Sequence, residues 1–262
     1  MIFKKEVKNT KMTPYEKVVF NRNKVRQASD YIKNIFTDFF EMHGDRRYGD
    51  DPAIISGIAK LGDISVTVIA QEKGADLKEK QTRNYGMAHP EGYRKALRQM
   101  KLAEKFGRPI ICFVDTSGAF CGLGAEERGQ GQAIAENLLE MSNLKVPIIA
   151  IVIGEGGSGG ALGIALADEI WMLENAVYSV ISPEGCASIL WKDSKRAAEA
   201  ATSLKLTAED LLGFNVIEKI IPDNDDVFNG IKVMLNQTLL KFSMMNVEQL
   251  LENRYNKFKS IK

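Results

Sequence analysis

The strongest constraint on the fold is a pattern that occurs twice: a strand signal, then glycines, then a helix signal. The first copy has an apolar run at 109–114, a glycine-rich turn at 118–124 and a helical segment at 125–143. The second has an apolar run at 146–153, followed by five glycines within 154–160 and a short helix. Alternation of buried strands with helices predicts an α/β fold with largely parallel strands.

The remaining segments fit one domain of this kind. Residues 1–27 are polar and basic, so we expect an extended N-terminal arm, followed by one domain at 28–245 and a C-terminal helix at 246–262. Ser29 is expected to cap a helix whose core face includes Phe36, Phe39 and Phe40. Further strands are expected at 53–61, 65–70, 169–173, 178–181 and 216–221. A basic helix is expected at 90–106, and a second helix is expected to be capped by Thr207 and to end at Gly213. The rest of the chain after 181 is expected to be helical.

Composition excludes several classes of function. A net charge of +1 gives no reason to expect nucleic acid or an anionic membrane as the main partner, and the longest apolar run is too short to span a bilayer. With two histidines, three separated cysteines and no CxxC pair, the sequence offers no ligand set for a metal, so we expect no metal site in this chain. The polar N-terminus is unlike a secretory signal, and we expect a cytoplasmic protein with reduced thiols.

The second glycine turn matches two well-known patterns. Ser158 between Gly156 and Gly160 fits GxSxG, but a hydrolase with this turn needs a histidine after the serine, and here both histidines precede it. Gly154, Gly156 and Gly159 fit the dinucleotide-binding GxGxxG, which leaves a dinucleotide-dependent oxidoreductase as an alternative. Its following helix is short. For the acidic residue usually found about 20 positions on, at the end of the next strand, Glu174 comes early and Glu184 late.

A third interpretation uses backbone groups. Glycines allow close approach of a ligand, and the first turn of a helix exposes unpaired N–H groups that can hold a developing oxyanion. This chemistry needs no histidine. A tight turn with close packing and no ligand is the remaining alternative.

Several longer motifs carry a resemblance to a known family. Residues 72–78 and the glycine turn resemble the two loops that supply oxyanion amides in crotonase relatives. Over about residues 13–222 the chain resembles the carboxyltransferase alpha subunit of bacterial-type acetyl-coenzyme A carboxylase. The motifs that carry this resemblance are His43–Arg46, Asn84–Met87, Pro90–Leu97, Gly124–Gln130, Gly154–Leu162 and Tyr178–Lys192.

The resemblance implies a fold, a reaction and partners. The fold would be crotonase-like (the ClpP/crotonase type), a spiral of ββα units with mostly parallel strands and flanking helices. The reaction would move a carboxyl group from carboxybiotin on a carrier protein to acetyl-CoA, giving malonyl-CoA for fatty acid biosynthesis. The chain would need a zinc-bearing beta subunit in an α2β2 assembly, would work with the biotin carboxyl carrier protein and biotin carboxylase, and would bind no cofactor covalently.

The resemblance also implies site residues. The loop that holds the biotin oxyanion would comprise Gly156, Gly157, Gly159, Gly160 and Ala161. The residues expected to line the substrate pocket are Lys73, Gly74, Gly118 and Ala119.

Two regions stand apart from this assignment. The family usually has proline, tyrosine and proline where this chain has Ser117, Phe120 and Cys121, which removes two ring constraints and one hydroxyl close to the expected site. The basic residues of the helix at 90–106 could meet CoA phosphates or an acidic partner, although a solvated face is the simpler interpretation.

Overall fold

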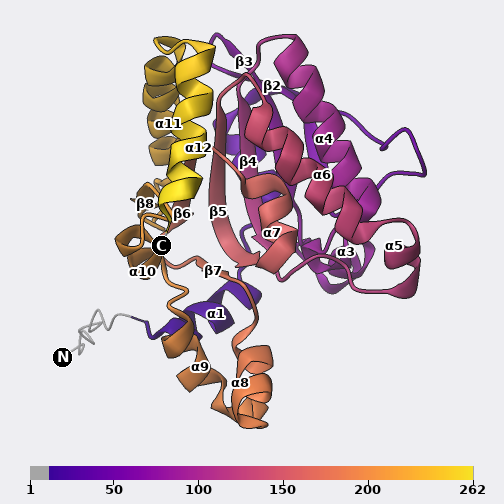
Figure 1. Ribbon diagram of the computed structural model, residues 1–262, viewed down its shortest axis with the longest axis vertical. Coiled ribbons are helices and arrows are strands. Elements are labelled where there is room, and N and C mark those ends of the chain that lie inside the picture. Colours follow the sequence, from indigo (N-terminus) through magenta and orange to yellow (C-terminus); the bar gives the residue numbers. More distant parts are fainter. Residues whose placement is uncertain (1–11, 262) are drawn as a thin grey trace, which may run out of the picture.

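The computed structural model describes residues 12–261, and its centre is one mixed β-sheet (Figure 1). The strand order is β1-β2-β3-β4-β5-β6-β8, and β7 pairs with the C-terminal end of β5. Strands β1 to β3 are antiparallel, whereas β3, β4, β5, β6 and β8 are mutually parallel. The strands are β1 Thr37–Glu41, β2 Ile54–Leu61, β3 Ile64–Gln71, β4 Ile110–Thr116, β5 Ile148–Gly157, β6 Glu169–Leu173, β7 Val177–Ser179 and β8 Lys219–Ile221.

Helices cover both faces of this sheet (Figure 1). Helices α4, α6 and α7 pack together on one face, and α2 with α11 lies on the other. Helices α8 and α9 form a lobe that projects below the sheet beside α1. The helices are α1 Pro14–Arg22, α2 Ala28–Ile35, α3 Leu77–Thr82, α4 Pro90–Lys105, α5 Leu123–Glu127, α6 Gln130–Asn143, α7 Ser158–Ala165, α8 Pro183–Trp191, α9 Ala197–Leu204, α10 Ala208–Gly213, α11 Val227–Ser243 and α12 Val247–Ser260, with short 3-10 turns η1 Asn84–Gly86 and η2 Ser194–Arg196.

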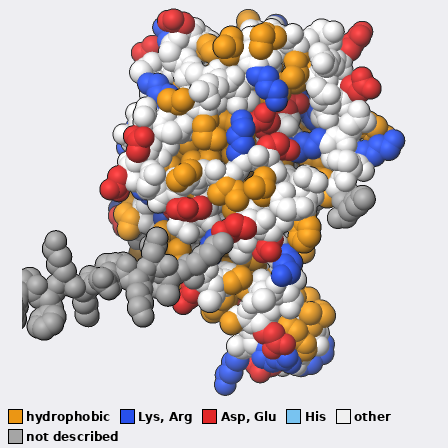
Figure 2. Space-filling view, turned by 90° about the vertical axis from the view of Figure 1, so that its left-hand side faces the viewer, with side chains coloured by type: hydrophobic (Ala, Val, Ile, Leu, Met, Phe, Trp, Pro, Cys, Tyr) orange, Lys and Arg blue, Asp and Glu red, His pale blue; other side chains and the backbone are white. Residues whose placement is uncertain are grey.

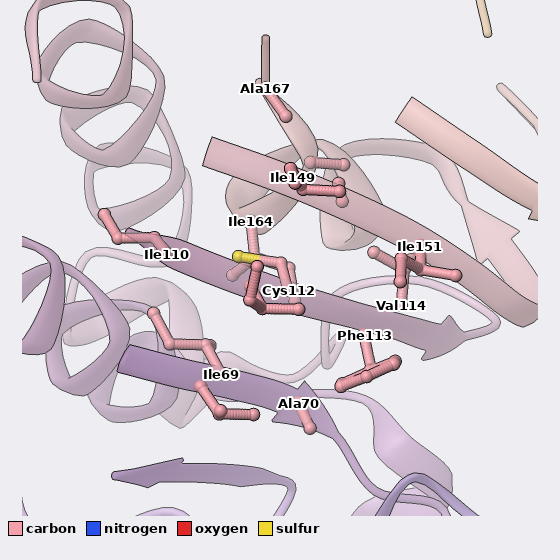
Figure 3. Packing of buried hydrophobic residues seen from close by; sticks show 14 of the residues in the cluster. Ile69, Ala70, Ile110, Cys112, Phe113, Val114, Ile149, Ile151, Ile164 and Ala167 are labelled. Atoms are coloured by element: carbon pink, nitrogen blue, oxygen red, sulfur yellow. The ribbon is translucent and has the colours of Figure 1, made fainter. Parts of the chain in front are cut away.

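Strand β4 shows why both faces must be covered (Figure 3). All seven of its residues are buried, and successive side chains point to opposite faces. Cys112 lies near Ile164 of α7, whereas Phe113 contacts the rings of Tyr31 and Phe36 on the α2 side. The predicted α/β architecture with mostly parallel strands and flanking helices is therefore confirmed.

Two predicted helices differ from the structure. The helix expected to continue to residue 40 was wrong, because α2 ends at Ile35 and β1 follows as an antiparallel edge strand. Phe36 is buried and Phe39 packs partly against the core, but Phe40 is 68% exposed. The helix expected over 125–143 is two helices, because Gly129 adopts a left-handed conformation (φ 84°) between α5 and α6.

The N-terminal segment was also misassigned in part. Residues 1–11 lie outside the described range, but residues 14–22 form α1 rather than an extended arm. Thr13 and Glu16 form a reciprocal capping box, and Val18 packs in a small core with Val177 and Leu206. The α1 helix is therefore part of the folded body.

The C-terminal helix α12 lies within the segment expected to be helical. Its buried Arg254 pairs with Asp168 at 2.8 Å and donates to the main-chain carbonyls of Met141, Leu144 and Val146. The boundaries of the predicted domain remain a prediction. Within residues 12–261, no helix has the length and hydrophobicity needed to cross a membrane.

Candidate functional site

The glycine turn lies at the C-terminal end of β5, in the middle of the parallel part of the sheet. Strand β5 continues to Gly157, and α7 begins at Ser158. The neighbouring strand β4 ends at Thr116, so the loop that follows it runs beside the turn. Ligands of open α/β sheets bind at this edge, beyond the carboxyl ends of the strands.

The main chain of the glycine turn after β5 packs directly against the main chain of the loop after β4. A Cβ added at Gly157 would lie 2.1 Å from the carbonyl oxygen of Ser117, and one at Gly160 would lie 2.3 Å from the carbonyl carbon of Gly118 and 2.4 Å from the nitrogen of Ala119. Any side chain at these two positions would push the loops apart. The structure thus brings the predicted Gly118 and Ala119 directly against the turn.

The other glycines of the turn have different surroundings. A Cβ at Gly156 would lie 2.7 Å from the ring of Tyr178, and one at Gly154 would lie 2.4 Å from Oδ1 of Asp115. At Gly159 the nearest neighbour would be Ile134, at 3.9 Å, which is ordinary contact. The requirement for glycine at 154 is therefore explained by packing within the chain, without a dinucleotide phosphate.

Helix α7 has an open N-terminal turn. Its N-cap, Gly157, provides no side-chain hydrogen bond, so main-chain N–H groups of the first turn are left for another acceptor. The turn is fixed from behind, because the carbonyl of Gly160 accepts hydrogen bonds from Gln71 Nε2 (2.8 Å) and the Tyr93 hydroxyl (3.3 Å). Fixed donors at the positive end of a helix dipole suit a developing anion.

Ser158 has no partner suited to nucleophilic catalysis. It is exposed, has a positive φ of 45°, and its hydroxyl forms no hydrogen bond within the described range 12–261. His43 contacts Asp50, and His89 stacks on Phe120 with ring centroids 4.0 Å apart. Neither histidine is placed as a base for this serine.

A buried ionic cluster of Lys73, Asp115 and Glu155 lies next to the glycine turn. The Lys73 ammonium lies 2.7 Å from Asp115 Oδ1 and 2.6 Å from Glu155 Oε2. Asp115 Oδ1 also accepts the main-chain N–H of Glu155 at 3.0 Å. Burial lowers the pKa of Lys73, but the two carboxylates outweigh this effect and hold the pKa above its ordinary value. Lys73 therefore stays charged and links the ends of β3, β4 and β5.

The same cluster reaches α1. The Arg22 guanidinium lies 3.2 Å from Glu155 Oε1 and 2.8 Å from Glu184 Oε1 of α8. Tyr15 adds a hydrogen bond to Glu184, at 3.1 Å. The side-chain hydrogen bond from Arg22 is the main reason why the pKa of Glu184 falls to about 2. Arg22 was missed at first because it lies in the segment taken for an extended arm.

The predicted pocket residue Lys73 is therefore engaged by two carboxylates, with its side chain only 11% exposed. Gly74 has a φ of 92°, and a Cβ there would lie 2.7 Å from the Glu79 main chain, so it forms the tight turn before α3. Glu155 and Asp115 were not predicted as site residues. The signal available for Asp115 was a polar residue at the end of a buried strand.

Two cavities adjoin the turn, and Ser158 lines both. A small cavity of about 60 Å³ lies under α1, between Arg22 and Gly157. A larger and mostly apolar cavity of about 310 Å³ lies between α7 and the C-terminal helix, with Leu162 and Phe258 among its lining residues. Across residues 12–261, no group of three or more His, Cys, Asp or Glu side chains is arranged to hold a metal ion.

Sequence comparisons identify the family. A model of the family described as acetyl co-enzyme A carboxylase carboxyltransferase-like matches residues 3–262. An acetyl-coenzyme A carboxylase carboxyl transferase subunit alpha from Ruminiclostridium cellulolyticum is 61% identical over 255 residues, covering 95% of this chain and 98% of that protein. A protein from Natranaerobius thermophilus named as subunits beta/alpha is 58% identical over 260 residues, covering 96% of this chain but only 43% of that longer protein.

Solved structures agree on the fold. A transcarboxylase 12S with methylmalonyl-coenzyme A bound matches with a TM-score of 0.73 and 18% identity, covering 86% of this chain and 43% of that one. The beta subunit of a P. aeruginosa geranyl-CoA carboxylase matches with a TM-score of 0.68 and 14% identity, covering 93% and 45%. These neighbours have the crotonase-like carboxyltransferase fold. Their sequence identity to this chain is far lower than that of the sequence relatives. The chain belongs to the acetyl-coenzyme A carboxylase carboxyltransferase alpha-subunit family.

Proposed function

We propose that this chain transfers a carboxyl group from carboxybiotin, carried by a partner protein, to acetyl-CoA, which yields malonyl-CoA. The observation that carries the proposal is the family membership of a chain whose glycine turn presents uncapped N–H groups at the edge of a parallel sheet. Such a reaction develops negative charge on the ureido oxygen of biotin and on the thioester oxygen of acetyl-CoA. The protein has to orient the reactants and stabilise these oxygens.

We assign the biotin oxygen to the glycine turn. The N–H groups of Gly159 and Gly160 belong to the first turn of α7 and would be the donors. Gly156 and Gly157 let the strand approach its neighbours closely, and Ala161 is fully buried behind the turn. Gly118 and Ala119 form the facing wall, while Lys73 and Gly74 hold the opposite loop.

A separate beta subunit completes the site in this proposal. Some relatives are named as subunits beta/alpha in one chain, which supports a beta subunit as the partner. Figure 2 shows hydrophobic side chains gathered on the lower lobe, where α8 and α9 lie, and Ile189 and Leu190 are each more than 60% exposed. An exposed apolar surface of this kind is suited to a protein partner. Zinc on the beta subunit, an α2β2 assembly, the biotin carboxyl carrier protein, biotin carboxylase and a cytoplasmic location belong to the same proposal.

The direct test compares the chain alone with the chain co-purified with its beta subunit. We expect malonyl-CoA formation from acetyl-CoA and a carboxylated biotin derivative only in the assembled sample. Transfer at full rate by the isolated chain would contradict dependence on a partner. Binding of a nicotinamide dinucleotide by the isolated chain would instead revive the oxidoreductase alternative.

Ser158→Ala tests whether a side chain of the turn does chemistry. We expect the assembled enzyme to keep a substantial fraction of its transfer rate, because the Ser158 hydroxyl has no catalytic partner in the described structure. Removal of a true nucleophile typically costs about 10⁴-fold or more in rate. A loss of that size, measured as kcat with the melting temperature unchanged, would show that the oxyanion interpretation is incomplete.

A further inference from the structure

A basic cleft lies away from the glycine turn, between the loop at 43–47 and α4. Its volume is about 460 Å³. The lining residues are Asp45, Arg46, Arg47, Arg94, Leu97, Arg98, Lys101, Leu102, Lys105 and Glu136. Six basic and two acidic side chains give the cleft a formal charge of +4, although the whole chain carries only +1. Positive charge is therefore concentrated at this one place.

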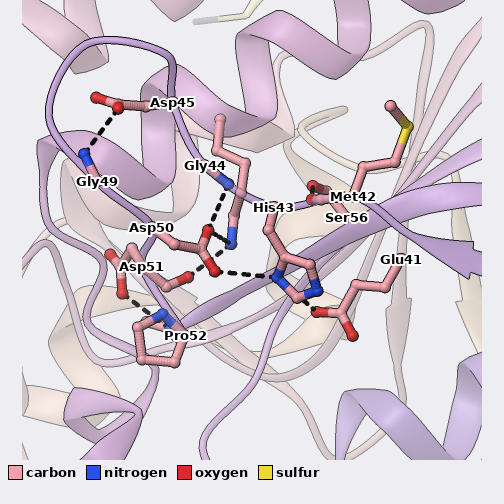
Figure 4. A network of polar contacts seen from close by, with 12 residues as sticks. Glu41, Met42, His43, Gly44, Asp45, Gly49, Asp50, Asp51, Pro52 and Ser56 are labelled. Carbon is pink, nitrogen blue, oxygen red and sulfur yellow. Dashed lines mark hydrogen bonds and ion pairs between the residues drawn. The ribbon is translucent and has the colours of Figure 1, made fainter.

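The carboxylate of Asp45 in this loop accepts hydrogen bonds from main-chain N–H groups of neighbouring residues (Figure 4). Asp45 Oδ1 accepts the main-chain N–H groups of Arg47, Tyr48 and Gly49 at 2.8–3.0 Å, and Asp45 Oδ2 pairs with Arg94 at 2.8 Å. Burial alone would raise the pKa of Asp45, but these donors outweigh it and lower the pKa to about 2. Asp45 thus stays ionised and fixes the loop, and its charge is paired with that of Arg94.

Asp50, just after the loop, is held by hydrogen bonds and ion pairs in the same manner (Figure 4). Asp50 Oδ1 accepts the main-chain N–H of Gly44 at 2.8 Å and pairs with Lys95 at 2.6 Å, while Oδ2 contacts His43 Nδ1 at 3.0 Å. The loop is therefore held rigidly by its own carboxylates. Its arginines keep their positions without using those carboxylates.

Two guanidinium groups of the cleft have no carboxylate partner within residues 12–261. Arg46 Nη1 donates to the carbonyl of His43 at 2.9 Å. Arg98 donates through Nε to the carbonyl of Gly44 and through Nη2 to that of His43, each at 3.0 Å. Both guanidinium groups thus bind neutral carbonyl oxygens rather than a carboxylate. Burial and the nearby charge of Arg46 lower the pKa of Arg98 by more than the charges of Asp50 and Asp45 raise it.

The cleft and the glycine turn share no lining residue. Tyr93 of α4 reaches the turn through Gly160, whereas its neighbour Arg94 pairs with Asp45 and lines the cleft. No residue of the turn at 154–161 or of the loop after β4 lines the cleft. An anion in the cleft would therefore not be the oxygen that the turn stabilises.

We propose that this cleft binds the phosphoryl groups of a small phosphorylated ligand. Guanidinium groups match phosphate oxygens in geometry and charge, and a cleft of this volume suits a small molecule. Leu97 and Leu102 provide apolar surface for the organic part of such a ligand. The phosphoryl groups could be those of coenzyme A or of a free nucleotide, and the experiment separates the two sources.

The test is calorimetric titration of the full chain with pyrophosphate. Arg46→Gln with Lys105→Gln removes two charges from the cleft and touches no residue of the glycine turn. We expect this double variant to lose at least tenfold in pyrophosphate affinity. The matched control is Lys195→Gln with Lys259→Gln, which removes the same charge from exposed side chains elsewhere, and it should bind within twofold of the original chain.

A second variant tests whether weaker binding is caused by a loss of folded structure. Lys101→Gln with Lys105→Gln changes only two exposed residues of α4, and it should also weaken binding at an unchanged melting temperature. Competition by coenzyme A but not by pantetheine would identify coenzyme A as the source, and competition by ATP alone would identify a nucleotide. Absence of saturable pyrophosphate binding, or equal binding by the cleft variants and the control, would overturn the proposal. Carboxyl transfer by the assembled enzyme can survive either result.

Discussion

Gly160→Ala in the assembled enzyme is expected to reduce carboxyl transfer by at least about 10²–10³-fold, the usual effect of losing one well-placed oxyanion donor. The added Cβ would lie 2.3 Å from the carbonyl carbon of Gly118 and 2.4 Å from the nitrogen of Ala119. Because these neighbours are main-chain atoms, they cannot rotate away as a side chain could. The turn and the facing loop must separate, and the N–H groups of the turn then no longer point toward the biotin oxygen.

Gly159→Ala is the matched control, since it adds the same methyl group one residue earlier. Its Cβ would meet only Ile134, at 3.9 Å, so the turn should keep its shape and the enzyme most of its rate. The N–H of residue 159 remains in this variant. Turnover, melting temperature and association with the beta subunit should be measured on each preparation. Near-normal turnover of Gly160→Ala, folded and assembled like the control, would remove the N–H groups of this turn from the mechanism.

The parallel core could be predicted from sequence because its signals are local. The run at 146–153 is apolar and mostly β-branched, and glycines follow at once, so one stretch of chain contains both a strand and its turn. The edge of the sheet gave a weaker signal. Phe39 and Phe40 fit helical spacing, but their strand exists only because β1 pairs with β2, a contact between segments distant in sequence.

The candidate site also has one part with a local sequence signal and one part without it. The glycines were visible in the sequence as a dense local motif, and the packing of Gly157 and Gly160 explains two of them. The ionic cluster was not visible, because Arg22 and Glu155 lie 133 residues apart and α1 shows only a weak apolar pattern. Long-range ion pairs leave no periodic signal in either partner. The structure was needed to find that α1 reaches the turn.

Lys73→Met should be the most destabilising single change near the site. The Lys73 ammonium neutralises the buried carboxylates of Asp115 and Glu155, at 2.7 and 2.6 Å. Removal of one partner from a buried ion pair typically lowers the free energy of unfolding by about 3–5 kcal/mol, because the remaining charge is left uncompensated. Since Asp115 also holds the N–H of Glu155, the glycine turn should lose its alignment and the transfer rate should fall. Chemical denaturation measures the first effect, and kcat of the assembled enzyme the second.

Two further variants separate support of the turn from direct contact with substrate. Lys78→Met removes an exposed lysine from the nearby helix α3 and should leave both measurements close to those of the original chain. Lys73→Met combined with Asp115→Asn removes one of the stranded carboxylates and should recover part of the lost stability, because less negative charge remains buried. If Lys73 acts only by supporting the turn, Lys73→Arg should restore some activity together with stability. A variant with normal stability and a selective rise in KM would instead show that Lys73 contacts the substrate.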